Sequence, residues 1–273
     1  MKIPRYVVLN KKVGETPLSC AEHWRSQQSA TYQNIPLAYA GRLDPMASGK
    51  LLILLGDECK RQDKYHALDK RYEFSMLFGI ASDTHDVLGR LTPDKRIPHP
   101  TKTDIDHCLP ILRGQITLPF PHFSAKTVKG KPLHMWTLEN RLHEITIPRQ
   151  QSFVYELRCT KVETKMRATI HDEVLQKVNS IPAVTDPKKA LGNDFRRVDV
   201  RADWSNWRAT DELSDRYTIA HFSCIASSGT YMRSLAAEIG SLLGTTGLAY
   251  HIERTHIGHY QKLGPWGIWL KKY

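Results

Sequence analysis

Ala40-Gly41-Arg42-Leu43-Asp44-Pro45-Met46-Ala47-Ser48-Gly49-Lys50-Leu51-Leu52-Ile53-Leu54 is the most informative stretch of the sequence. An isolated Asp-Pro pair usually marks an ordinary turn, because Asp bonds to the nearby backbone and Pro fixes φ. Here Gly41 and Gly49 flank the pair, so the backbone of a short loop can approach a ligand closely. The apolar run that follows predicts a buried segment that anchors this loop in the core. We therefore expect Asp44 to be a functional residue on a rigid turn.

The rest of the chain shows patterns of both strands and helices. Alternating apolar and polar residues predict strands, and apolar residues at helical spacing predict helices. Strands separated by helices and by long excursions favour an α+β fold with a mixed sheet. The expected strands cover residues 6–10, 70–79 and 217–225, and the expected helices cover 19–28, 103–112 and 231–243, the second with Thr103 as its N-cap and Gly114 as its stop.

One region interrupts these patterns. Residues 163–216 are rich in charged and turn-forming residues, including Pro182, Pro187 and Gly192, and show little strand or helix signal. We expect this region to be an insertion within a single catalytic domain that covers residues 1–273. It either contributes to ligand binding or is a surface loop with no role.

Composition indicates a globular protein with a polyanionic partner. The chain of 273 residues carries a formal net charge of +11, a balance typical of proteins that bind nucleic acid. The acid-free stretch from Leu118 to Leu138 interleaves Lys126, Lys129 and Lys131 with aromatic residues, as single-stranded nucleic acid favours. A solvated basic face above core aromatics is the alternative interpretation of this stretch.

The same composition argues against membrane and secreted classes. The sequence has no stretch of about 18 consecutive apolar residues, and its N-terminus leads directly into a predicted strand. The five cysteines are far apart and form no C-x-x-C pair, so neither a disulfide framework nor a zinc site is expected. We therefore expect a cytoplasmic protein.

Four blocks along the chain resemble, in order, the motifs of the TruB family of pseudouridine synthases. Residues 40–54 match the form G-x-L-D-P-x-A-[ST]-G followed by an apolar strand, and Lys70-Arg71-Tyr72 resembles the K-x-Y of the family. Residues 118–130 are similar to P-P-x-[YF]-S-A-x-K-x-x-G, and residues 228–235 to G-T-Y-[IV]-R-[ST]-L. The resemblance covers about residues 5–262, apart from the expected insertion.

This resemblance implies both a fold and an activity. The implied fold is the pseudouridine synthase fold, a mixed but mostly antiparallel sheet with flanking helices and loops. The implied reaction converts a uridine of tRNA to pseudouridine, in TruB the T-loop uridine at position 55. A carboxylate nucleophile can form the covalent intermediate of this reaction, so no cofactor and no metal are expected. The expected partner is the T-arm of tRNA, bound by a monomer with no obligatory protein partner.

The resemblance also assigns roles to individual residues. Asp44 would be the nucleophile, and Arg233 would favour its charged form and orient it. Tyr72 would stack on the target base, although a tyrosine in an alternating run is more often an ordinary strand residue. Without the motif, Arg233 would be taken for a surface helix arginine. The residues expected to bind substrate are Tyr231, Ile252, Lys60, Lys11, Arg42, Lys126 and Lys129.

The sequence also departs from the family. Tyr39-Ala40-Gly41 stands where TruB proteins usually carry H-T-G, and Arg42 gives the G-R-L-D form that also occurs in the RsuA and RluA families. Only thirteen residues follow Tyr260, too few for the C-terminal PUA domain of many TruB proteins, so we expect no PUA domain. Two alternatives therefore stay open: an RsuA/RluA-like rRNA pseudouridine synthase, and a noncatalytic tRNA-binding or tRNA-folding protein on the same scaffold.

Overall fold

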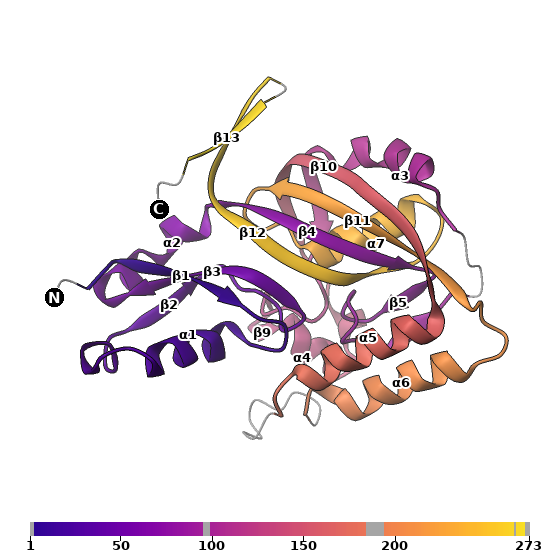
Figure 1. Cartoon of the computed structure of the whole chain (residues 1–273), viewed down its shortest axis with the longest axis horizontal. Helices are drawn as coiled ribbons and strands as arrows, with labels where there is room; N and C mark the ends of the chain where they lie inside the picture. The colour runs from indigo at the N-terminus through magenta and orange to yellow at the C-terminus, as the bar shows by residue number, and fades with distance from the viewer. Residues whose placement is uncertain (1–2, 95–98, 184–193, 265, 271–273) are drawn as a thin grey trace.

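The computed structural model describes residues 3–94, 99–183, 194–264 and 266–270 (Figure 1). In these residues nine strands form one sheet. Its strands are β1 (Tyr6–Lys11), β2 (Leu37–Ala40), β3 (Ala47–Leu55), β4 (Asp69–Phe78), β7 (Gly114–Pro119), β10 (Arg149–Met166), β11 (Arg216–Ala226), β12 (Gly247–Leu263) and β13 (Trp266–Leu270).

The sheet is mixed and mostly antiparallel. Its main path runs β1-β3-β12-β4-β11-β10-β7, with β2 beside β3 and β13 beside β12. Within the described residues, the pairing of β12 with β3 is parallel and the other pairings of this sheet are antiparallel. This topology confirms the α+β fold class and the sheet type expected from the sequence.

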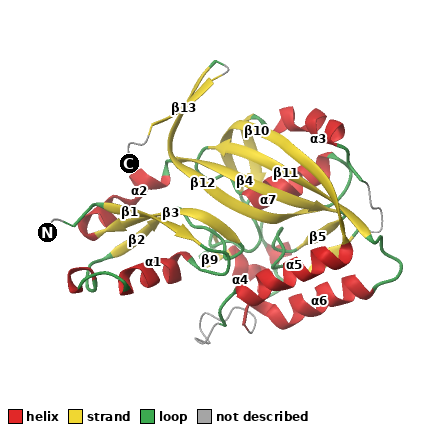
Figure 2. Ribbon diagram, in the orientation of Figure 1, coloured by secondary structure: helices red, strands yellow, loops and turns green. Residues whose placement is uncertain are grey.

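The helices lie around this sheet (Figure 2), and among the described residues none is long and apolar enough to cross a membrane. Four short strands also pair outside the main sheet, as β5 with β6 and β8 with β9. The helices are α1 (Pro17–Ser26), α2 (Gln62–His66), α3 (Lys102–Cys108), α4 (Leu133–Leu138), α5 (Arg167–Ser180), α6 (Arg197–Ala209) and α7 (Met232–Leu242), and the short strands are β5 (Ile80–Ser82), β6 (Leu91–Pro93), β8 (Thr127–Val128) and β9 (Lys131–Pro132).

The predicted elements are found, with one correction at the start of α3. The N-cap is Thr101 and not Thr103, because Thr101 and Asp104 form a reciprocal capping box: the Thr101 hydroxyl accepts from the Asp104 amide, and the Asp104 carboxylate accepts from the Thr101 amide. The α-helix ends at Cys108 and continues as the 3₁₀ turn Leu109–Leu112. The predicted helix over 103–112 therefore contains two kinds of helical turn.

The expectation of little regular structure in 163–216 is wrong. Strand β10 extends to Met166, and α5 and α6 follow as a packed pair, with residues 184–193, including Pro187 and Gly192, lying outside the described residues. Both helices are mostly polar, so the helical pattern is sparse. The side chains that join the main core are Ile170, Val174 and Val178 from α5, and Val200, Trp204 and Trp207 from α6.

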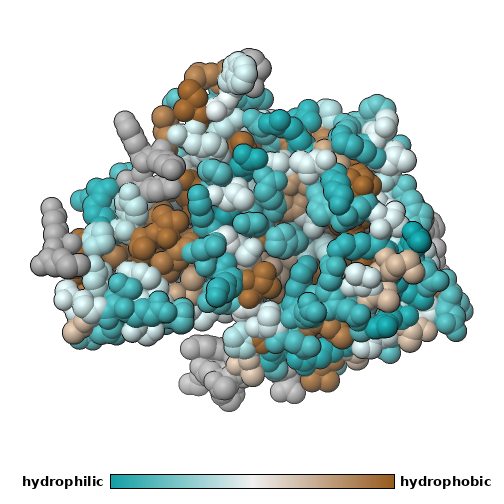
Figure 3. Space-filling model, viewed as in Figure 1, coloured by the Kyte–Doolittle hydropathy of each residue, from teal (hydrophilic) through white to brown (hydrophobic). Residues whose placement is uncertain are grey.

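The sheet brings distant segments together at one point. Strand β12 lies between β3 and β4, where Ile252 pairs with Ala47 and Arg254 pairs with Tyr72. Asp44 lies three residues before β3 and is thereby placed next to β12. The C-terminal part of β12 forms a hairpin with β13 that projects from the body (Figure 1) and carries apolar side chains, one of several hydrophobic patches on this face (Figure 3).

The close contact of β3 with β12 leads to a prediction about Gly49. Its φ is +101°, and a Cβ there would lie 2.4 Å from the Arg254 carbonyl oxygen. Gly49→Ala should therefore lower the free energy of unfolding by about 3 kcal/mol. The strain of a positive φ and the overlap of the new Cβ with the Arg254 backbone both contribute to this loss. Gly56→Ala is the control, since φ is +60° there but nothing lies within 4 Å, and it should cost about 1 kcal/mol. Equal losses in urea unfolding would contradict this account.

Candidate active site

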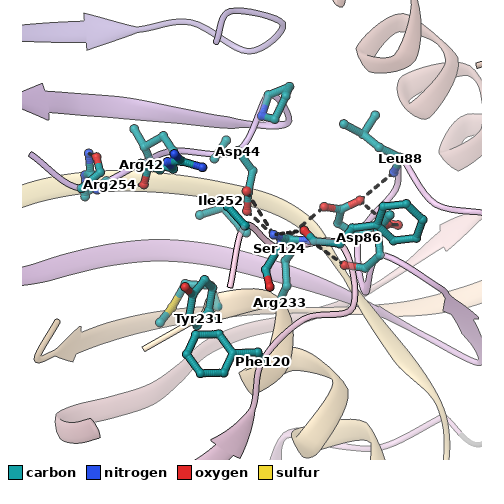
Figure 4. Close-up of a pocket in the computed structure, with 18 of the residues that line it drawn as sticks. Arg42, Asp44, Asp86, Leu88, Phe120, Ser124, Tyr231, Arg233, Ile252 and Arg254 are labelled. Atoms are coloured by element: carbon teal, nitrogen blue, oxygen red, sulfur yellow. Dashed lines mark hydrogen bonds and ion pairs between the residues drawn. The ribbon is translucent and has the colours of Figure 1, made fainter. Parts of the chain in front are cut away.

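A pocket of about 1320 Å³ opens where β12 meets the loop that carries Asp44. Its walls come from the 41–47 loop, β4, the 120–126 segment, the start of α7, and residues of α5 and α6. Figure 4 shows Asp44, Arg233 and Asp86 meeting at this pocket, with Tyr231, Phe120 and Ile252 nearby. Residues from Leu37 to Arg254, far apart in the sequence, thus share one cavity.

Asp44 and Arg233 form an ion pair in this pocket. The Arg233 Nε lies 2.8 Å from Asp44 Oδ2, and Nη2 donates to Oδ1 at 3.1 Å. The Arg233 side chain is only 5% exposed, whereas that of Asp44 is 37% exposed. The guanidinium therefore contacts the carboxylate from the buried side, and the carboxylate stays accessible from the pocket. Arg233 is thus not the surface helix arginine of the alternative interpretation.

Arg233 is itself held by two loops. Its Nη1 donates to the Thr84 carbonyl at 3.0 Å, and Nη2 also approaches the Phe123 carbonyl at 3.4 Å. Its Nε lies 3.6 Å from Asp86 Oδ2. A buried guanidinium needs such partners, because an unpaired buried charge is strongly destabilising. The guanidinium position therefore depends on where the 82–90 and 120–124 segments lie.

Asp86 is a site residue that the sequence analysis missed. It is 3% exposed, and its Oδ1 accepts from the Thr84 hydroxyl at 2.6 Å and from the Leu88 amide at 2.9 Å. Burial raises the pKa of Asp86 to about 6, with Arg233 acting in the opposite direction. The sequence did hold a signal for a site residue here. Two acids, Asp83 and Asp86, stand in the short run Ser82-Asp83-Thr84-His85-Asp86, directly after a buried strand.

Aromatic and apolar side chains complete the pocket. Tyr72, Tyr231 and Ile252, all expected to bind substrate or stack on it, line the cavity. Phe120 packs edge-on against Tyr231, with 5.5 Å between ring centroids. Burial raises the pKa of the Tyr72 and Tyr231 hydroxyls above the usual value, so both stay neutral hydrogen-bonding groups at physiological pH.

Arg254, a second residue that the sequence analysis missed, ties both ends of the loop that carries Asp44. It is 1% exposed, and its guanidinium donates to the carbonyls of Lys50 at 2.7 Å, Gly41 at 3.2 Å and Arg42 at 3.4 Å. Lys70 is also buried nearby, and burial lowers its pKa to about 7, with Arg254 acting in the same direction. The backbone on both sides of Asp44 is therefore fixed by one side chain.

Comparison with known proteins identifies the family. Residues 31–177 match the model described as TruB family pseudouridylate synthase (N terminal domain), which covers more than half of the chain. The chain belongs to the TruB family. This membership favours TruB over the RsuA and RluA alternatives that Arg42 had left open.

Individual relatives are distant. The chain is 28% identical to tRNA pseudouridine synthase B of Caldicellulosiruptor saccharolyticus, over 73% of this chain and 70% of that protein. It is 27% identical to tRNA pseudouridine synthase 4 of Saccharomyces cerevisiae, over 76% of this chain and 57% of the relative. A structure titled as a Cbf5-Nop10-Gar1 complex matches with a TM-score of 0.51 at 15% identity, over 93% of this chain and 48% of that chain, and this likeness shows the fold alone.

The basic residues expected to bind substrate separate into two groups. In this TruB family member, Arg42 and Lys126 line the pocket. Lys60 instead pairs with Asp57 at 2.7 Å, Lys11 is 1% exposed and donates to the Lys12 and Glu15 carbonyls, and Lys129 donates to the Glu144 carbonyl at 3.1 Å. Among the described residues these three lie outside the pocket lining. Their roles in binding stay predictions.

The Asp86–Arg233 contact predicts a pH dependence. Asp86 attracts Arg233 only when it is ionised, so turnover should fall as the pH drops through about 6. Asp86→Asn keeps the shape and the hydrogen bonds but removes the charge. The variant should lower kcat about tenfold, which corresponds to an interaction worth about one pKa unit. The fall in kcat below about pH 6, the acid limb of the profile, should also disappear. A variant that keeps this limb in a kcat profile from pH 5 to 8 would contradict the assignment.

Proposed function

We propose that this TruB family member is a tRNA pseudouridine synthase that isomerises uridine 55 in the T-arm, with Asp44 as its nucleophile. The observation that carries the proposal is the Asp44 carboxylate, half-exposed in the pocket and paired at 2.8 Å with a buried guanidinium. The names of its relatives, tRNA pseudouridine synthase B and tRNA pseudouridine synthase 4, support tRNA as the substrate.

The residue types suit the chemistry. In the isomerisation the N1–C1′ bond of uridine breaks and a C5–C1′ bond forms, while C5 loses a proton and N1 gains one. A carboxylate nucleophile divides this change into easier steps through a covalent intermediate. Arg233 pairs with Asp44 and orients it through two contacts, at 2.8 and 3.1 Å. This ion pair is therefore the proposed centre of catalysis.

The pocket also suits a flipped base. A uridine inside a folded RNA loop must leave its stack before a carboxylate in a protein pocket can reach it, which costs a few kcal/mol. Tyr72, Tyr231 and Phe120 line the cavity and offer aromatic surface that offsets part of this cost. We propose Tyr72 as the residue that stacks on the base.

We also propose that the protein acts in the cytoplasm as a monomer.

Asp44→Asn tests the proposed nucleophile. The amide keeps the size of the carboxylate but lacks its charge, so turnover should fall below detection while tRNA binding persists within about threefold. The assay follows pseudouridine by chemical derivatisation, since the isomerisation leaves the mass unchanged, on an unmodified tRNA T-arm stem-loop. Wild-type protein that forms no product on total unmodified tRNA would reject the enzyme proposal. Normal turnover in the variant would reject Asp44 as the nucleophile.

Lys126 and Lys131 provide a matched test of RNA contact. Lys126 is exposed at the pocket, 5.2 Å from the centre of the Phe120 ring, whereas Lys131 is paired with Glu139 at 2.7 Å. Lys126→Ala should lower the slope of log K against log salt by roughly 0.7 to 0.9, the value for one lost phosphate contact. Lys131→Ala should leave the slope nearly unchanged. Equal slopes for wild type and Lys126→Ala would place the RNA contact elsewhere.

A further inference from the structure

Helix α6 is bonded along its length to the loop that carries Asp86. Trp204, which is fully buried, donates from its indole nitrogen to the Val87 carbonyl at 3.0 Å. Asp203 accepts from the Leu91 amide at 3.0 Å and from Arg90 at 2.6 Å. The 82–91 segment is therefore supported by a helix that lies more than 100 residues later in the chain.

Arg196, at the N-cap of α6, adds a contact of a different kind, because it joins two segments. Its guanidinium makes two hydrogen bonds to the Asp83 carboxylate, at 2.5 and 3.2 Å. The same guanidinium also lies over the face of the Phe123 ring, with 4.2 Å from Cζ to the ring centroid. The planar guanidinium suits both contacts, since it forms paired bonds to a carboxylate and also stacks on an aromatic ring.

These two contacts lie directly beside the groups that hold Arg233. Asp83 precedes Thr84, whose carbonyl accepts from Arg233 at 3.0 Å. Phe123 itself supplies the second carbonyl, at 3.4 Å from Arg233. A shift of either segment would move an acceptor of the Arg233 guanidinium, and with it the orientation of Asp44.

The backbone at Arg196 is consistent with a constrained position. Its φ is +57° and ψ is +24°, in the left-handed region that residues other than glycine and asparagine rarely adopt. Such a conformation persists where surrounding contacts determine it. The Arg196 side chain is only 16% exposed, so the contacts with Asp83 and Phe123 are largely shielded from water.

We propose that Arg196 is a positioning residue for catalysis: by clamping Asp83 and Phe123 together, it sets the two carbonyls that orient Arg233 against Asp44. The proposal rests on the proposed function, because it concerns the rate of the same reaction. It gives the α5–α6 region a role in the chemical step. The earlier alternatives for this region were a ligand-binding insertion and a surface loop with no role.

The test compares Arg196→Ala with Arg201→Ala. Arg201 lies on the same helix but bonds to Asn179 of α5 at 2.8 Å, away from the pocket lining, so it controls for general weakening of the helix pair. Single-turnover rate, KM and the Kd for a T-arm stem-loop are measured for each full-length protein, with the melting temperature as a check on folding. Arg196→Ala should lower the rate about 10- to 100-fold, as small misplacements of catalytic groups do, with KM and Kd within about twofold of wild type.

Two further variants separate positioning from structural support. Arg196→Lys keeps the charge but loses the paired bonds and the stacking, so its rate should lie between those of wild type and Arg196→Ala. Asp83→Asn retains the oxygen that accepts from the Arg90 amide but loses the charge that pairs with Arg196. If the clamp acts as one unit, the double variant Asp83→Asn/Arg196→Ala should be no slower than the slower single variant.

Each outcome decides the proposal. A rate within twofold of wild type in Arg196→Ala overturns it, and so does a loss of binding that accounts for the loss of rate, which would make Arg196 an RNA contact. Equal losses in Arg201→Ala would reduce the effect to helix stability and overturn it as well. An inactive wild-type protein would instead reject the proposed function, so the two failures are distinguishable.

Discussion

The buried charge of Arg233 is the constraint on which the site depends. Its side chain is 5% exposed, and a guanidinium withdrawn from water must recover its lost hydration from fixed partners. The partners are two carboxylates, Asp44 and Asp86, and the backbone carbonyls of Thr84 and Phe123; Asp86 and Thr84 share one loop, and Asp44 and Phe123 each lie in another. Three loops far apart in sequence must therefore converge on one helix start, and the mixed sheet is the scaffold that allows this.

The parts of this arrangement that the sequence predicted are local. Asp44 stands in a glycine-flanked turn before an apolar run, and Arg233 lies in a block of ordered motif residues, so both could be proposed without coordinates. Asp86 and Arg254 were missed: two nearby acids mark the segment of Asp86, but the contacts that give both residues a role join positions at least 147 apart. No local pattern reports such a contact.

Helices α5 and α6 were missed for a related reason. Each fully buries only three apolar side chains in the main core, and the rest of each helix is mostly polar, so the signal is weaker than the helical stripe of α7. Three of the basic residues expected to bind substrate, Lys11, Lys60 and Lys129, lie outside the pocket lining, and their roles stay predictions. Lys60 has an acidic neighbour three residues away, and an exposed lysine commonly pairs with such a neighbour, so positive charge near a motif was poor evidence for a place in the pocket.

The two carboxylates that share Arg233 differ in their surroundings, and this difference divides their roles. Asp86 is almost fully buried, and burial raises its pKa, so its charge depends on the guanidinium and on the Thr84 and Leu88 donors. Asp44 is 37% exposed and faces the cavity where a substrate would lie. One acid is thus suited to fix the arginine and the other to meet the ligand. Each carboxylate lies on its own segment. Hydrogen bonds from Arg254 fix the segment 41–47, and hydrogen bonds with α6 fix the segment 82–90.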